Sequence, residues 1–233
     1  PPPVRETTAG VLLVAAAAAG FGTIGIFGEL AARIGLPLST LLPVRFAAAT
    51  AVLGGVAAAR GWSLPAARRD RATALGLGAV YTVMTVLYFV SLRHLTAGMA
   101  TIVLYTYPAM AIVLSAATLG ESITARTAAG LGLATAGVAL VVGTDAAGVT
   151  PAGVALALGA AACYAVYTAG SRYVVPRATP RGVMVGVLAG TTASMTVYGV
   201  LAGGLALPTR TTGWGIVAGI TVLSTVLPHL LFY

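Results

Sequence analysis

Long apolar runs alternate along this chain with short polar or Gly/Pro-rich joints. Each run approaches or exceeds the ~18 to 20 residues that an α-helix needs to span a bilayer. Strands of a membrane barrel would instead alternate polar and apolar positions over about ten residues. The pattern therefore predicts eight transmembrane helices, at residues 10–32, 38–59, 72–90, 97–119, 124–142, 152–173, 182–207 and 214–233.

The composition favours an all-α polytopic membrane protein. Of the 233 residues, 58% are hydrophobic and only 8% are charged, whereas about a quarter of a typical soluble domain is charged. So few charges cannot cover a soluble surface. Small residues crowd the runs, for example at 15–20 and 47–51, and allow the close backbone approach by which membrane helices pack.

The basic residues indicate an orientation and argue against nucleic-acid binding. The net charge is +8, but the thirteen arginines form no single stripe, and most lie in the joints. If the N-terminus is cytoplasmic, nine arginines fall inside, and Arg33, Arg93 and Arg210 fall outside. Because short cytoplasmic loops carry an excess of Lys and Arg, the bias predicts a cytoplasmic N-terminus.

An internal repeat is visible at an offset of 143 residues. It aligns the pairs Gly10 and Gly153, Val11 and Val154, Pro37 and Pro180, Gly76 and Gly219, Thr82 and Thr225, Val83 and Val226, and Phe89 and Phe232. The unit holds five helices, an odd number, so the second unit enters the membrane from the opposite side. Inverted repeats of this kind are typical of secondary transporters.

The repeat also predicts the domain organisation. Residues 1–143 form the first five-helix repeat, and residues 144–233 form a second repeat with about three of its five helices. A complete second unit would end near residue 286, because 143 + 143 = 286. We therefore expect ten helices in the complete protein, with about two absent from this chain.

The fourth and fifth runs carry a family resemblance. The segment LTAGMATIVLYTYPAMAIVLSAATLGESITARTAAGLGLATAGVALVV has a small-residue start, a mid-helix proline at Pro108, a closing Leu-Gly-Glu and a Gly-rich helix. It resembles helices four and five of the EamA-type drug/metabolite transporter superfamily. Pro37 and Arg45-Phe46 match the second helix, whereas Phe21-Gly22 stands where the family has Trp-Gly.

The resemblance implies a fold, a location and a general activity. Members of that superfamily have ten helices in two five-helix repeats. They move amino acids, metabolites, nucleotide sugars or drugs. For this chain the resemblance implies a secondary transporter in a prokaryotic plasma (inner) membrane, with the substrate left open.

Pro108 interrupts the fourth run. Proline removes a backbone donor, so the carbonyl of Leu104 needs another partner. Thr101, Tyr105 and Pro108 share a face with Gly98, because they are spaced three and four residues apart. The segment is either a kinked helix that lines a cavity or a packing kink between helices.

Arg45 and Glu29 are charged residues inside apolar runs. Arg45 lies about 10 Å from the start of its helix at 1.5 Å per residue. A charge at the membrane centre costs ~2.5 to 3.5 kcal/mol even on the lenient insertion scale. Three readings stay open: an Arg45–Glu29 ion pair, a substrate or proton role, or exposed ends in which Arg45 snorkels and Glu29 pairs with Arg33.

Aromatic and hydroxyl residues gather at mid-membrane depth on three helices. They either line a binding cavity between the repeats or make interhelical hydrogen bonds and aromatic packing. His229, after Pro228, is either a proton carrier or a satisfied core residue. The candidate lining residues are Tyr81, Thr85 and Tyr88 on one helix, Tyr164 and Thr168 on another, and Ser194 and Tyr198 on a third.

A secondary transporter that works by alternating access is the function expected from these features. The rivals are a non-transporting membrane receptor or subunit and an intramembrane enzyme, for which no catalytic set of residues is apparent. We expect no cofactor and no metal. The expected partners are a small-molecule substrate and the lipid bilayer, with a homodimer as an open alternative.

Overall fold

The computed structural model is all-helical in the part of the chain that it describes. The described residues are 4–119, 124–125, 128–130, 132–133, 136–137, 140, 150–174, 179–203 and 206–232. Within them, seven helical segments are long and apolar enough to cross a membrane. Seven of the eight predicted runs are thereby confirmed as helical spans. Most of the fifth run, 124–142, lies outside the described residues.

The helices follow the predicted runs closely, and most begin or end within a few residues of the expected position. The elements are α1 (Val4–Arg33), α2 (Leu38–Ala59), α3 (Arg68–Ser91), α4 (Ala97–Leu104), α5 (Tyr107–Leu119), α7 (Pro151–Val174), α8 (Pro180–Leu201), α9 (Thr211–Thr221), the π-helical stretch η2 (Val222–Val226) and α10 (Leu227–Phe232).

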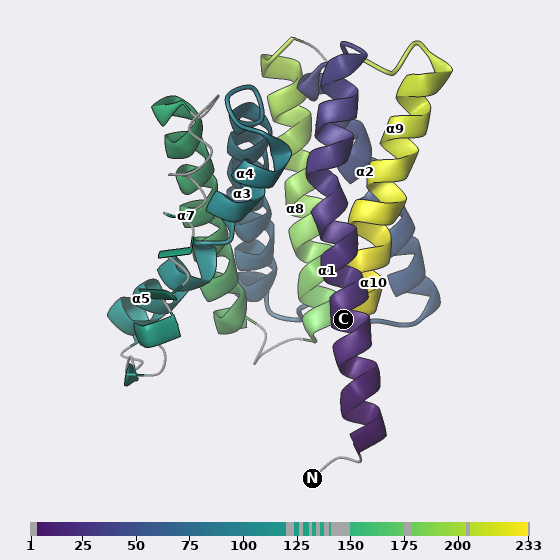
Figure 1. Cartoon of the computed structure of the whole chain (residues 1–233). Coiled ribbons are helices and arrows are strands. Elements are labelled where there is room, and N and C mark those ends of the chain that lie inside the picture. The colour runs from purple at the N-terminus through teal and green to yellow at the C-terminus, as the bar shows by residue number, and fades with distance from the viewer. Residues whose placement is uncertain are drawn as a thin grey trace.

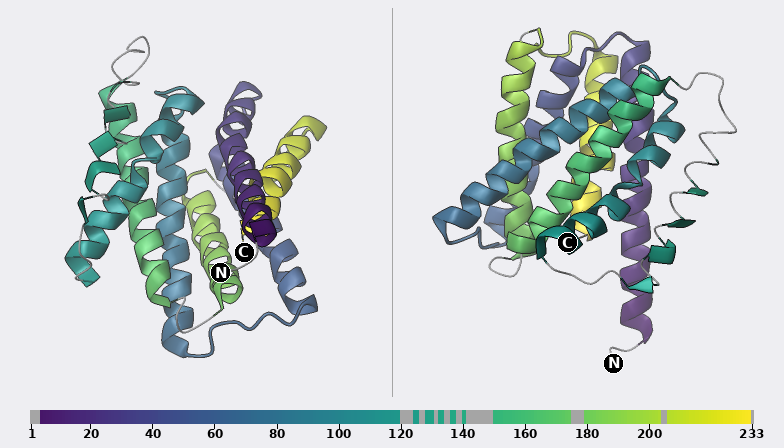
Figure 2. Two further views of the ribbon diagram at one scale, coloured as in Figure 1. Left: turned by 60° about the horizontal axis from the view of Figure 1, so that its bottom comes forward. Right: turned by 90° about the vertical axis from the view of Figure 1, so that its left-hand side faces the viewer.

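The helices form one bundle with α8 between two groups (Figure 1). On one side α3, α4 and α5 pack against α7, and on the other side α9, η2 and α10 pack against α1. α8 contacts α3 of the first group. It also contacts α2, which packs against α9 and η2 of the second group. Figure 2 shows that the N-terminus and the C-terminus lie at the same end of the bundle.

Two predicted helices are irregular near their prolines. The fourth run is two helices, α4 and α5, because Tyr105 and Thr106 form a turn immediately before Pro108. The eighth run widens into η2 shortly before Pro228. Proline lacks the N–H that would continue an α-helix. The kink expected at Pro108 is therefore a turn between two helices. The eighth run is confirmed as one helical span, with a π-helical stretch inside it.

The seventh run is shorter than expected. α8 ends at Leu201, although the apolar run continues to residue 207. Gly203 has φ +139°, a conformation that L side chains rarely adopt and that glycine tolerates. The chain then runs without regular structure from 206 to 209. A glycine conformation, which the apolar pattern does not reveal, therefore ends this helix.

α3 and α8 approach each other closely. A methyl group added at Gly78 would collide with the backbone of Val187 and Thr191 on α8. The hydroxyl of Thr191 donates to the carbonyl of Gly78 at 3.2 Å, and the hydroxyl of Thr82 reaches the carbonyl of Thr191 at 3.4 Å. This crossing follows the small-residue packing expected of membrane helices. It fixes α3, which carries Tyr81 and Tyr88, against the centre of the bundle.

Candidate functional site

Arg45 is the buried charge at the centre of the candidate site. Its side chain is only 1% exposed, and Nε donates to Oγ1 of Thr225 at 2.9 Å. The guanidinium carbon lies 4.8 Å from the ring centroid of Phe46. Arg45 thus points into the protein, as its depth predicts, and it does not snorkel to the interface.

Glu29 does not pair with Arg45. Its carboxylate accepts a hydrogen bond from Arg33 at 2.7 Å, and both side chains are more than half exposed. The predicted Arg45–Glu29 ion pair is therefore wrong, and the i,i+4 pair at the end of α1 is found instead. One turn separates Glu29 from Arg33 on the same helix, whereas Arg45 lies inside the bundle against η2.

The π-helical stretch η2 is tied to both neighbouring helices. The hydroxyl of Thr225 accepts from Arg45 on α2 and donates to the carbonyl of Ile220 at 3.1 Å. The hydroxyl of Ser224 lies 2.6 Å from that of Thr23 on α1, which donates to Gly20 at 2.7 Å. Ser224 must therefore be the donor to Thr23, because each hydroxyl has one proton. Two consecutive residues thus hold α1 and α2 together.

His229 continues this network toward the other end of the bundle. Its Nδ1 lies 2.6 Å from the carbonyl oxygen of Thr225. A carbonyl can only accept, so Nδ1 carries the proton. The ring also meets Phe21 of α1 edge-on, with centroids 5.4 Å apart. The partly buried His229 therefore extends a polar chain that begins at Arg45.

Tyr88 of α3 is a second buried residue with a polar group. It is 5% exposed, and its hydroxyl and that of Thr101 are 2.9 Å apart. Thr101 also donates to the carbonyl of Ala97 at 2.7 Å, so the proton between the two hydroxyls comes from Tyr88. A methyl group added at Gly25 would lie 2.9 Å from the Tyr88 hydroxyl. The absence of a side chain at Gly25 leaves room for this hydrogen bond.

An aromatic cluster extends from Arg45 across α3, α7 and α5. Phe46 meets Tyr81 edge-on at 6.0 Å between centroids, and Tyr81 lies 5.3 Å from Tyr167. Tyr164 stacks on Tyr167 at 5.7 Å and lies 4.2 Å from Tyr107. The structure thus brings together Tyr81 and Tyr164, two of the predicted lining residues, at 6.3 Å between ring centroids.

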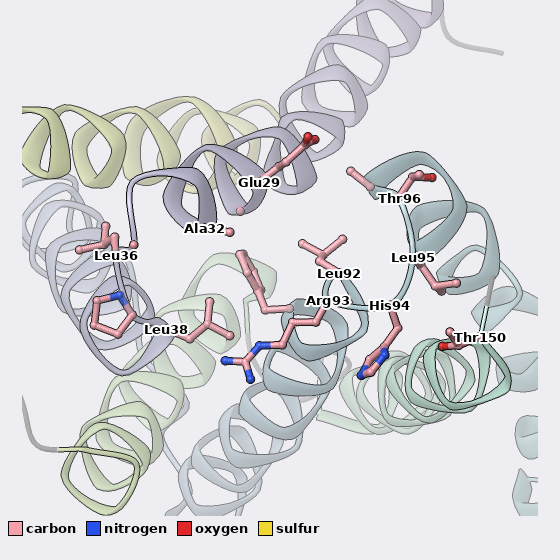
Figure 3. A pocket seen from close by; sticks show the side chains of 15 residues that line it. Glu29, Ala32, Leu36, Leu38, Leu92, Arg93, His94, Leu95, Thr96 and Thr150 are labelled. Carbon is pink, nitrogen blue, oxygen red and sulfur yellow. The ribbon is translucent and has the colours of Figure 1, made fainter. Parts of the chain in front are cut away.

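Two pockets open at opposite ends of the bundle. The larger, about 770 Å³, lies between the end of α1, the α1–α2 connection and the α3–α4 connection. Figure 3 shows Glu29 and Ala32 on one side of it, with Arg93 and His94 on the other. The smaller, about 320 Å³, is lined by the end of α2, the start of α8 and His229. We call them the outer and the inner pocket.

Arg45 lies between these pockets along α2, because Leu38 of that helix lines the outer pocket and Val56 lines the inner one. His229 lines the inner pocket and is linked to Arg45 through Thr225. Phe89 and Ala97 line the outer pocket. The Phe89 ring meets that of Tyr88 edge-on, and the Ala97 carbonyl accepts a hydrogen bond from Thr101. Among the described residues, Arg45 is buried and lines neither pocket.

Other predicted lining residues have different roles. The hydroxyls of Thr85 and Thr168 donate to the carbonyls of Tyr81 and Tyr164 within their own helices. Tyr105 is 51% exposed and its ring lies 6.3 Å from that of Tyr107, and Pro108 is exposed. The predicted common face with Thr101 is broken by the turn at Tyr105. Among the described residues, Ser194 and Tyr198 make no hydrogen bond or ring contact with this group.

Sequence reasoning missed two important contributors. Thr225 was visible only as a partner of Thr82 in the repeat, and no local pattern shows that it accepts from Arg45. Tyr107 precedes Pro108 and belongs to α5, so the assumption of one continuous helix hid its position. The position of Pro228 could have indicated an irregular helix near Thr225, because proline perturbs the preceding turn.

The site offers hydrogen bonding, a buried positive charge and aromatic surface. In the described part of the chain, no group of three or more His, Cys, Asp or Glu side chains is placed to hold a metal ion. The hydroxyls of Thr225 and Tyr88 are already engaged in hydrogen bonds.

Comparisons with known proteins agree with this architecture. The sequence model of the EamA-like transporter family matches residues 8–143. A solved crystal structure of a protein has a TM-score of 0.71 to this chain at 20% sequence identity. The match covers 97% of this chain and 78% of the other, and at this identity it shows a shared fold. Comparison with curated proteins gives no match.

Proposed function

We propose, from the premise that this chain belongs to the EamA-like transporter family, that it is a secondary transporter that moves a small organic molecule by alternating access. The observation that carries this proposal is the position of Arg45. A buried guanidinium lies between pockets at opposite ends of a membrane-spanning bundle. Intramembrane charges of this kind typically mark substrate or ion pathways.

The packing suggests how the site would open alternately. α3 contacts α7 and α8, and the unit of α9, η2 and α10 contacts α1 and α2. The third helix of each half of the chain thus packs against the first two helices of the other half, as inverted repeats would require. Transporters of this type work by rocking one repeat against the other around a central site. In this protein the rocking would open the Tyr88 side and the His229 side in turn.

The orientation in the membrane follows from the arginines. Arg60, Arg68, Arg69 and Arg71 lie around the α2–α3 connection, at the end of the bundle that holds the inner pocket. Arg33 and Arg93 lie at the opposite end. By the positive-inside rule, the inner pocket and the N-terminus face the cytoplasm, and the outer pocket faces outward. The proposed location is a prokaryotic plasma membrane.

Transport in proteoliposomes tests the function. Purified protein is first screened for thermal stabilisation by amino acids, metabolites and drug-like molecules, because ligands that bind the folded state raise apparent stability. Hits are then followed as labelled solutes in counterflow. We expect saturable exchange of at least one hit, and no exchange by protein-free liposomes. A folded protein that binds a hit but exchanges none would favour a receptor over a transporter.

A further inference from the structure

The guanidinium of Arg45 has a donor that the protein leaves unused. Nε donates to Thr225, but Nη1 is buried and has no hydrogen-bond partner among the described residues. A buried donor without a partner costs about 1–3 kcal/mol, and more when it is charged.

The charge of Arg45 is also uncompensated within the described structure. Glu29 and Asp70 are the acidic residues whose side chains are described there. Glu29 is bound to Arg33 at the end of α1, and Asp70 lies in the first turn of α3, near the inner end of the bundle. Neither forms an ion pair with Arg45. A buried cation normally has a partner, so an anion from outside the protein would supply what is missing.

The surroundings of Arg45 favour an anion with an apolar, aromatic body. The ring of Phe46 lies against the guanidinium and leads to Tyr81, Tyr167 and Tyr164. A second buried donor without a hydrogen-bond partner, the hydroxyl of Thr221, lies on the turn before Thr225. Aromatic surface accepts flat apolar groups, and a guanidinium fork matches a carboxylate.

We propose that Arg45 recognises a carboxylate on the substrate, through Nη1, while the aromatic cluster receives an apolar or aromatic body. The inference rests on the proposed transport site and names the chemical class of its ligand. Arg45 keeps Nε on Thr225, so binding need not break the existing hydrogen bond. A cationic ligand is repelled at this position, and a neutral ligand leaves the charge without compensation.

Three probes of similar shape test this inference: benzoate, benzamide and benzylamine. Each is titrated into the purified protein while the midpoint of thermal unfolding is followed. We expect a saturable rise with benzoate and at least tenfold weaker effects of benzamide and benzylamine. Arg45→Met should remove the benzoate effect. The exposed Arg33→Met, which changes an arginine outside both pockets, serves as the matched control and should keep the effect.

A second variant keeps the test decisive if Arg45→Met does not fold. Arg45→Lys retains the charge and loses the planar guanidinium. The benzoate concentration that gives half of the maximal stabilisation should therefore rise at least tenfold. Equal stabilisation by benzoate and benzamide, or no effect of benzoate on the folded wild type, would overturn the inference. Loss of the effect in Arg93→Met and its persistence in Arg45→Met would place the anion in the outer pocket and also overturn it.

The transport proposal can fail separately from this inference. Benzoate binding that depends on Arg45, without counterflow of any solute, would leave the carboxylate site standing and remove the transport function. Counterflow of neutral or cationic solutes that is unchanged by Arg45→Met would do the reverse. The two experiments therefore report on different claims.

Discussion

Thr50 of α2 and Thr192 of α8 each donate a hydrogen bond to the backbone of the other's helix. The Thr50 hydroxyl reaches the carbonyl of Leu188 at 3.1 Å, and the Thr192 hydroxyl reaches that of Phe46 at 3.0 Å. The two hydroxyl oxygens are 2.7 Å apart. The two hydroxyls have one proton each for these three close contacts. Together, Thr50 and Thr192 fix the crossing of α2 and α8.

The residues of these two hydrogen bonds are related by a constant offset in the sequence. Thr192 follows Thr50 by 142 residues, and Leu188 follows Phe46 by the same 142 residues. An approximate two-fold relation between the halves would produce this reciprocity. It supports the proposed inverted repeat from contacts alone, although the offset at this crossing is one residue shorter than the 143 of the sequence alignment.

Thr50→Val and Thr192→Val test the coupling of the two hydroxyls. Each single change should lower the free energy of unfolding by about 0.5–1.5 kcal/mol, the range of hydrogen bonds between membrane helices. The double variant should cost less than the sum, because both changes break one network. The measurement is unfolding in detergent or bilayers. Thr118→Val is the control, since that exposed hydroxyl bonds only within α5. Strictly additive costs would contradict the coupling.

Arg45 should be coupled to Thr225 and independent of Glu29. Thr225→Val strands Nε of Arg45, so it should destabilise by about 1–3 kcal/mol. Adding Arg45→Met should recover part of this loss, because replacing a buried ion with an apolar side chain is often neutral or stabilising.

Double-mutant cycles on thermal stability measure both relations. Arg45→Met and Glu29→Ala should add within about 0.5 kcal/mol, as changes without shared partners do. An Arg45–Glu29 coupling as large as that of Arg45 with Thr225 would contradict the structure of the site.

Gly78 and Gly76 of α3 should respond oppositely to alanine. A methyl at Gly78 meets the backbone of α8, which cannot move aside as a side chain would, whereas at Gly76 nothing lies within 4 Å. We expect Gly78→Ala to cost about 1–3 kcal/mol through overpacking. Gly76→Ala should be neutral or stabilise by up to about 1 kcal/mol, because alanine favours the helix. Thermal unfolding of the two variants gives the comparison, and equal effects would refute a close α3–α8 contact.

The membrane orientation can be read from cysteine labelling in a Cys163→Ala background. Ala66 lies in the connection between α2 and α3, and Thr212 lies at the start of α9, and both are exposed. An impermeant thiol reagent added to intact cells should label Thr212→Cys. It should label Ala66→Cys only after the membrane is opened. Labelling of Ala66→Cys from outside would reverse the proposed topology.

The apolar pattern predicted the helices because membrane spans need long apolar runs whatever they pack against. It located seven spans and the depth of Arg45. It could not show which residue Arg45 meets, because Thr225 is 180 residues away and contacts it only through tertiary packing. The sequence suggested Glu29 as the partner because it is an acid inside an apolar run. Ion pairing depends on position, however, and Arg33 lies one helical turn from Glu29.

The breaks in the fourth and eighth runs were only partly predictable. Pro108 and Pro228 predicted an irregular backbone, but not the form that it takes. One proline follows a turn that separates two helices, and the other follows a π-helical stretch. The choice depends on which neighbours satisfy the freed backbone groups. For η2, a direct hydrogen bond comes from the side chain of Thr225, whose hydroxyl donates to Ile220.

The π-helical stretch at Val222–Val226 has a consequence for the tolerance of this segment to changes in length. A π turn holds about one residue more than an α turn. Deleting one residue there would let the segment continue as an ordinary α-helix, and the rest of the chain would rotate by about 100°, the angle that one residue occupies in an α-helix. His229 would then turn away from Phe21 and from the inner pocket. The extra residue thus sets the rotational register in which the end of the chain meets α1.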